Sequence, residues 1–194
     1  LKEHKIKRLG LPSKTSDKQI WNVLSKEKNI KWIAIGLMNA MKGNNKGCLS
    51  FASDPWSSQE KAYPKELNQL LDLPRYISKN YLSLDLFKVI KKSLRTLPFF
   101  LNIKNLDISK KLLTKVTKSI FNPGINMHTL TTLFDYLLVL YFTKKRIKDN
   151  PQLSIIFLNH IAHLQHHFWL DSPEIHPQMV HGMKICNEIF GILL

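Results

Sequence analysis

Half of the histidines in this chain lie close together, in the segment Asn-His-Ile-Ala-His-Leu-Gln-His-His-Phe-Trp at residues 159–169. His160, His163, His166 and His167 are four of the eight histidines in the sequence. Neutral imidazole is a common zinc ligand, and clustered histidines can converge on one ion. If the segment is helical, the first, second and fourth of these side chains share a face. This pattern predicts metal or phosphate chemistry. The alternative is that the histidines cap or line a packed surface and bind nothing.

The sequence before the histidines predicts where they lie. Residues 153–158 are almost continuously apolar, which is typical of a strand covered on both faces in a parallel sheet. A helix expected over about 127–147 and a turn at 149–151 precede this strand. Since ligands of open α/β sheets gather at the carboxyl ends of strands, we expect the histidines at such an edge. Asp135, inside the expected helix, either supports a site residue or lies on the surface.

The first third of the chain predicts a helix, a strand and a long loop region. Ser16 and Gln19 form a capping-box pattern, which indicates a helix start at Ser16. A short strand is expected next, over residues 30–36. Residues 37–82 read as irregular, with a short strand near 48–51 and prolines that hold loop conformations.

Helices account for the rest of the chain. One is expected over 83–97, with lysines on one side, as surface helices have, and apolar residues on the other: Leu86, Val89, Ile90 and Leu94. Pro98 is expected to end it. A second helix is expected over 109–121 and a last one after His176.

Together these elements predict an α/β fold with a mostly parallel sheet flanked by helices and a helical insertion. We expect one partial domain over residues 1–194. Its parts are a helix and strand (15–36), a loop region (37–82), a helical insertion (83–125), a helix, core strand and histidine motif (126–170), and a final helix (171–194).

The amino-acid composition excludes few classes of function. The chain has 44% hydrophobic and 22% charged residues, as globular proteins do, and a formal net charge of +15. A basic balance suits nucleic acid, a membrane surface or a phosphorylated substrate. The lysines are scattered, however, and no arginine-rich stripe with interleaved aromatics stands out, so a nucleic-acid partner is not favoured. No apolar run approaches the roughly 18 residues of a membrane-spanning helix.

The two cysteines, Cys48 and Cys186, predict buried reduced thiols rather than a disulfide scaffold or a thiolate zinc site. Reduced thiols fit a reducing compartment such as the cytoplasm.

Three short segments, in order, resemble the alkaline phosphatase superfamily, which includes type I phosphodiesterases and nucleotide pyrophosphatases. Residues 159–163, Asn-His-Ile-Ala-His, resemble its Asp-x-x-x-His metal motif with Asn in place of Asp. Residues 37–39, Leu-Met-Asn, are similar to a Ser-Met-Asn segment after an early strand. Residues 53–57, Ser-Asp-Pro-Trp-Ser, resemble a Pro-Asp-Pro-Trp-Ser loop. The resemblance covers roughly residues 15–170.

This resemblance implies a divalent metal, with zinc the first expectation, in a two-metal site of the complete protein. His163 and Asn159 would be metal ligands. The substrate would be a phosphorylated small molecule or glycan. Its contacts are expected from His166, His167, Trp56 and Asn39.

The same comparison shows what the sequence lacks. An amide oxygen at Asn159 binds a divalent cation less strongly than a carboxylate, because it carries no charge. The nucleophile and the remaining metal ligands of the superfamily cannot be placed in this chain. The sequence starts at Leu1 and stops within apolar residues, so we expect a piece of a larger hydrolase, inactive by itself. The alternatives are a non-catalytic metal- or phosphate-binding remnant and a basic nucleic-acid binder.

Overall fold

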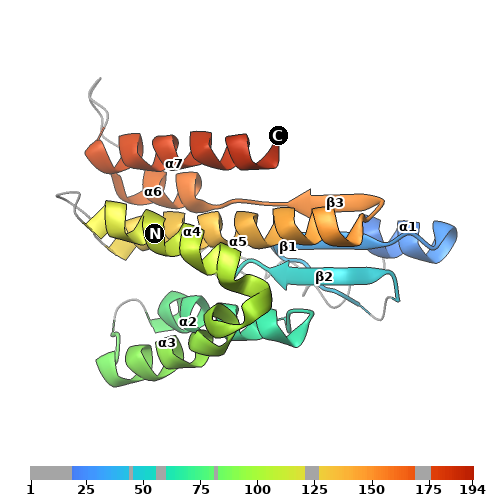
Figure 1. The fold of residues 1–194 in the computed structure, drawn as a ribbon, viewed down its shortest axis with the longest axis horizontal. Helices are drawn as coiled ribbons and strands as arrows, with labels where there is room; N and C mark the ends of the chain where they lie inside the picture. Colours follow the sequence, from blue (N-terminus) through green and yellow to red (C-terminus); the bar gives the residue numbers. More distant parts are fainter. Residues whose placement is uncertain (1–18, 44–45, 56–59, 81–82, 121–126, 169–175) are drawn as a thin grey trace, which may run out of the picture.

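The computed structural model describes residues 19–43, 46–55, 60–80, 83–120, 127–168 and 176–194. A three-stranded parallel sheet in the order β2-β1-β3 lies among the helices (Figure 1). The strands are β1 (Trp32–Leu37), β2 (Cys48–Ser53) and β3 (Leu153–Ile156). The helices are α1 (Ile20–Lys28), α2 (Lys65–Asn80), α3 (Leu86–Leu101), a short 3-10 turn η3 (Ile103–Asn105), α4 (Leu106–Ile120), α5 (Met127–Asp149), α6 (His160–Phe168) and α7 (Pro177–Leu193). The expected α/β class, with a parallel sheet flanked by helices, is confirmed.

The central strand β1 sends alternate side chains to two apolar clusters, because successive residues of a strand point to opposite faces. Ile33 and Ile35 are fully buried against α2 and α5. Trp32 and Ala34 face the other way and pack with Trp21 of α1, whose ring centroid lies 5.8 Å from that of Trp32. Both faces of β1 are therefore covered, as a parallel sheet requires.

The strand β3 differs from its prediction. All four of its residues are only half-buried, whereas a strand covered on both faces was expected. The reason is its place in the sheet: β3 pairs with β1 and, within the described residues, forms one edge. Leu153 and Ile155 pack against the cluster of Trp32. Ile156 packs against the cluster of Ile33 and against a third cluster formed by residues of α5 and α7.

Two predictions about the first third of the chain are wrong. Gln19 is extended (φ −71°, ψ 136°) and is the residue before α1, so it cannot be the third residue of a capping box that begins at Ser16. The region 37–82 also contains the 16-residue helix α2. Its buried residues Leu67, Leu70 and Leu71 have helical spacing, but Pro74 lies within the helix and hides that pattern.

The prediction that Pro98 ends a helix is also wrong. Helix α3 continues through Pro98 to Leu101. Proline removes the hydrogen bond to the carbonyl of Leu94, four residues earlier. Leu94 is 58% exposed, so water can replace that bond.

On the apolar side expected for this helix, Leu86, Ile90 and Leu94 are exposed. Val89 on the same side is half-buried, whereas Phe99 is buried in the core. No helix in the described part of the chain is long and apolar enough to cross a membrane.

The thiols give a first test of the packing. Both cysteines are free; Cys48 is buried and Cys186 is half-buried. Burial raises the pKa of the Cys48 thiol to about 12. Since the thiolate is the reactive form, Cys48 should be almost entirely unreactive at pH 8 in the folded chain.

We therefore expect a disulfide reagent at pH 8 to modify Cys186 in the folded chain and Cys48 only when the chain unfolds. Stopped-flow labelling with peptide mass spectrometry measures the two rates separately. Labelling of Cys48 at the rate of Cys186 would show that the β2 side of the sheet is not packed as described.

Candidate functional site at the carboxyl end of the sheet

The three segments that follow the strands meet at one edge of the sheet. Leu37 pairs with Ser53, and the amide of Asp54 donates to the carbonyl of Leu37 at 3.0 Å. On the other side of β1, the amide of Phe157 donates to the carbonyl of Ile35 at 2.9 Å. In Figure 1 the strands point the same way, and α6 begins beyond the tip of β3. Ligands of parallel sheets bind at this edge.

A buried carboxylate joins α5 to the start of α6. The Oδ2 atom of Asp135 accepts three hydrogen bonds, from the backbone amide of Asn159 at 2.8 Å, the backbone amide of His160 at 2.9 Å and the Nδ1 atom of His160 at 2.9 Å. Asp135 is 7% exposed and His160 only 2%. The carboxylate thus accepts hydrogen bonds from backbone amides that have no partner at the start of a helix. Its negative charge also interacts favourably with the positive end of the helix dipole. Asp135 is therefore buried and does not lie on the surface, which was one of the two roles considered for it.

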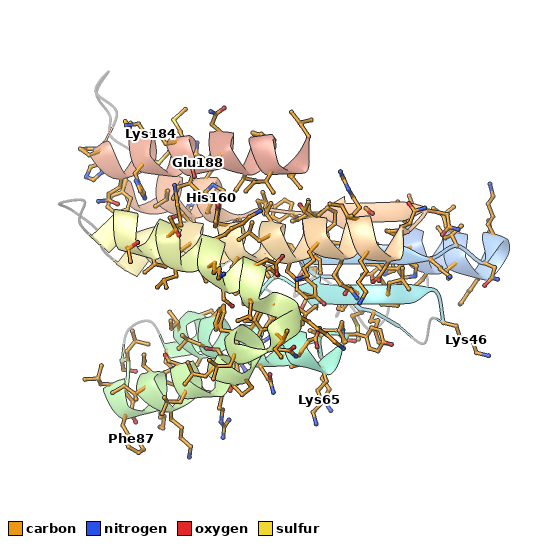
Figure 2. The ribbon with its side chains drawn as sticks, in the orientation of Figure 1. Lys46, Lys65, Phe87, His160, Lys184 and Glu188 are labelled. Atoms are coloured by element: carbon orange, nitrogen blue, oxygen red, sulfur yellow. The ribbon has the colours of Figure 1, made fainter. Side chains whose placement is uncertain are left out.

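The second ring nitrogen of His160, Nε2, is buried and has no hydrogen-bond partner among the residues that the structure describes. Figure 2 shows His160 near the start of α6. The carboxylate at Nδ1 fixes the orientation of the ring. Histidines that bind metal commonly donate their other nitrogen to a carboxylate in this way. His160 was noted only as one of four clustered histidines, because the sequence does not show that Asp135, 25 residues earlier, reaches it.

The two predicted metal ligands lie at the same helix start. Asn159 directly precedes α6, and its carbonyl accepts from the amide of His163 at 2.9 Å. His163 is half-buried one turn into the helix. This four-residue spacing places both side chains on one face, as the metal motif requires. Whether they bind metal stays a prediction.

The structure describes the side chains of only some of the other predicted site residues. His166 is exposed on α6. The side chain of His167 and the whole of Trp56 lie outside the described residues, so nothing tests those predictions. Asn39 lies in the turn after β1 with a positive φ of 49° and is exposed.

The turn that contains Asn39 is fixed by α1. The side chain of Gln19 donates to the carbonyl of Asn39 at 3.2 Å and accepts from the amide of Met41 at 3.0 Å. The indole of Trp21 donates to the carbonyl of Met41 at 3.2 Å. These contacts explain why α1 precedes the strand: its N-terminal end holds the loop at the carboxyl end of β1.

Sequence reasoning missed Arg75, a half-buried residue of α2 that lies at the end of β2. Arg75 of α2 donates to the hydroxyl of Ser53 at 3.4 Å and to the carbonyl of Glu60. Burial lowers the pKa of its guanidinium. The adjacent Asp54 is only 3% exposed. Only the recognition of α2 could have indicated Arg75, since no motif in the sequence includes it.

The described side chains do not form a complete metal site. Among the residues that the structure describes, no group of three or more His, Cys, Asp or Glu side chains could hold a metal ion. Asn159 and His163 would be a partial set, and further ligands would have to come from elsewhere.

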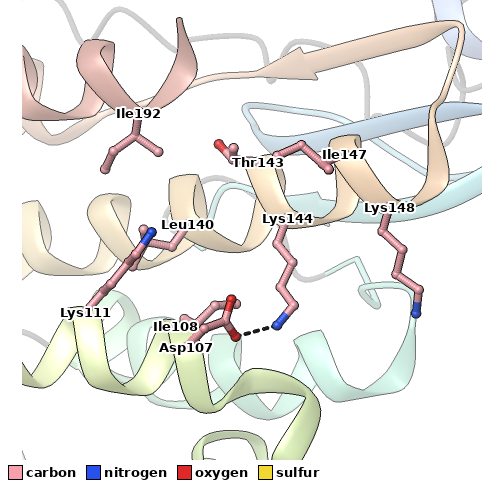
Figure 3. A pocket seen from close by; sticks show the side chains of 9 residues that line it. All are labelled: Asp107, Ile108, Lys111, Leu140, Thr143, Lys144, Ile147, Lys148 and Ile192. Carbon is pink, nitrogen blue, oxygen red and sulfur yellow. Dashed lines mark hydrogen bonds and ion pairs between the residues drawn. The ribbon is translucent and has the colours of Figure 1, made fainter.

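A second candidate, an open pocket of about 330 Å³, lies between α4, α5 and α7 (Figure 3). It is lined by Asp107, Ile108, Lys111, Leu140, Thr143, Lys144, Ile147, Lys148 and Ile192. Asp107 already forms an ion pair with Lys144 at 2.5 Å, and Figure 3 shows Lys148 extending away from that pair. The pocket lies at the C-terminal end of α5, which leads to the amino end of β3, and is therefore away from the histidines.

Comparison with known proteins finds no matching family model, no similar curated protein and no similar solved structure. Arguments about function therefore rest on the site itself.

Proposed function

We propose that this chain forms part of a metal-dependent phosphoesterase of the alkaline phosphatase type. One observation supports the proposal most. The three segments that resemble this superfamily lie up to about 120 residues apart in the sequence, yet all follow adjacent parallel strands at one edge of the sheet. In such sheets this edge is where ligands bind.

In this proposal Asn159 and His163 hold one divalent cation, with zinc the first expectation, and Asp135 fixes the helix start that presents them. The metal, when bound, would polarise the phosphate ester as a Lewis acid. The substrate would be a phosphorylated small molecule or glycan. Its contacts would come from His166, His167, Trp56 and Asn39. The nucleophile is not assigned to any residue of this chain, so we expect the chain alone to have no turnover.

Zinc affinity tests this assignment residue by residue. Replacement of Asn159 by aspartate should lower the dissociation constant for zinc about tenfold or more, because a carboxylate adds a negative charge to the ligand set. Replacement of His163 by alanine should raise it by at least about tenfold, because one ligand is lost. Competition with a zinc-responsive dye measures both.

His166→Gln is the matched control. It removes an exposed histidine from the same helix that is proposed to contact phosphate rather than metal, so zinc affinity should not change. If all three variants bind zinc as the unaltered chain does, the ion is not held by Asn159 and His163, and the proposed metal site is wrong.

A non-catalytic binding role is the second candidate, and it is favoured by one residue. Asn159 supplies an uncharged ligand where the superfamily motif has aspartate, and loss of a charged ligand weakens metal-dependent catalysis. Hydrolysis of bis(4-nitrophenyl) phosphate by the protein from the full gene separates the two candidates. Turnover that depends on added zinc supports the hydrolase, whereas zinc or phosphate binding without turnover supports the binder.

A further inference from the structure

Helix α3 carries an apolar surface that the rest of the described chain leaves uncovered. Six large side chains are between 44% and 74% exposed: Leu86, Phe87, Ile90, Leu94, Leu97 and Leu101. At 100° per residue they fall within an arc of about 100° on one side of the helix. We call these six residues the α3 stripe. Figure 2 shows one of them, Phe87, at the outer boundary of the molecule.

The α3 stripe is distinct from the side of α3 that packs on the protein. Phe99 is 2% exposed, and its ring centroid lies 6.1 Å from that of Tyr141 in α5. The side chain of Lys92 reaches Asp72 of α2 at 2.8 Å. The helix is therefore anchored by one side, and the stripe remains available to a partner. Monomeric proteins rarely expose so long a continuous apolar surface without a function.

Basic side chains occupy other parts of the exposed surface of α3. Lys88, Lys91 and Arg95 are all exposed. At 100° per residue, Lys91 lies about 40° from the edge of the stripe, Arg95 about 80° and Lys88 about 100°. The helix itself contains no acidic residue. Lys88 forms an ion pair with Asp85, which caps the helix, and Arg95 forms one with Asp72 of α2. The whole chain carries a formal net charge of +15.

We propose that the α3 stripe docks on an anionic lipid bilayer, with α3 lying in the plane of the interface. A helix with leucine and phenylalanine on one side and lysine and arginine on its polar surface binds such bilayers by apolar burial and by attraction to acidic headgroups. The formal net charge of +15 complements an acidic bilayer better than a neutral protein partner. The inference is independent of the proposed phosphoesterase activity.

Vesicle sedimentation tests the proposal with the full chain. We expect binding to vesicles of mixed phosphatidylcholine and phosphatidylglycerol, and much weaker binding to phosphatidylcholine alone or at high salt, where charge attraction is screened. Phe87→Glu and Leu94→Glu should each lower the partition coefficient about tenfold or more, since each removes a large apolar side chain from the contact and adds a negative charge. Both residues are exposed, so the fold should be kept, which circular dichroism checks.

Ile147→Glu is the matched control. Ile147 is 76% exposed on α5 and, like the stripe, is flanked by exposed basic residues, Arg146 and Lys148. Its replacement should leave vesicle binding within about twofold, because isolated exposed apolar residues contribute little. The proposal is overturned if the chain does not bind anionic vesicles, or if Ile147→Glu weakens binding as much as the stripe variants. It is also overturned if Phe87→Glu dissolves a dimer in sedimentation velocity while vesicle binding is absent.

Discussion

Replacement of Asp135 by alanine is expected to destabilise the folded chain by about 3 to 5 kcal/mol. The carboxylate accepts hydrogen bonds from two backbone amides and one ring nitrogen, all buried, and alanine would leave the three donors without a partner. For a chain of this size the loss corresponds to a fall of about 10 °C in the melting temperature. Urea unfolding followed by circular dichroism measures the change.

Asp107→Ala is the control for this experiment. Asp107 also forms an ion pair with a basic side chain, Lys144, but it lies on the surface. Exposed pairs contribute about 0 to 1 kcal/mol, so this variant should unfold nearly as the unaltered chain does. Equal effects of the two variants would contradict a buried supporting role for Asp135.

A double-mutant cycle with His160→Ala separates the two functions of the carboxylate. If Asp135 acts mainly by fixing the imidazole, the effects of the two substitutions should overlap, with a coupling energy of about 1 to 3 kcal/mol. If it acts mainly on the two backbone amides of α6, the effects should add. Either outcome identifies which hydrogen bonds hold the start of the histidine helix.

Replacement of Gly36 by alanine is expected to cost about 3 kcal/mol or more, because two unfavourable terms combine. Gly36 has a φ of +77°, which side chains rarely adopt. A Cβ atom there would also lie 2.2 Å from the carbonyl oxygen of Phe157, a backbone atom that cannot rotate away. The substitution would push β3 from β1 at the edge where the candidate site lies.

Alanine substitutions at two other glycines provide comparisons for this prediction. At Gly182 a Cβ would lie 2.3 Å from Cδ1 of Leu164, the end of a flexible side chain, so Gly182→Ala should cost less than Gly36→Ala. At Gly191 no heavy atom lies within 4 Å, and alanine in this helix should stabilise the chain by about 0.5 to 1 kcal/mol. Chemical unfolding of the three variants gives the order. Equal losses at Gly36 and Gly182 would show that the approach of β1 to β3 is looser than described.

The sequence by itself determined the class of the fold and the place of its strands. Residues 30–36 and 153–158 are short apolar runs between turn residues, and such runs form strands whatever they later pack against. The structure places β1 and β3 there, starting and ending within two residues of those ranges. The order in which the motifs follow the strands was also visible, and for parallel strands this order brings them to one edge.

Tertiary structure decided what local patterns could not. The pairing of Asp135 with His160 depends on how α5 crosses the sheet, and no rule of spacing links residues 25 positions apart. The side of α3 that is buried could not be predicted for a similar reason. Leu86, Ile90 and Leu94 form the more regular apolar side, yet Phe99 reaches the core because the helix continues beyond Pro98. Periodicity shows that a helix has an apolar side, but packing decides which side is buried.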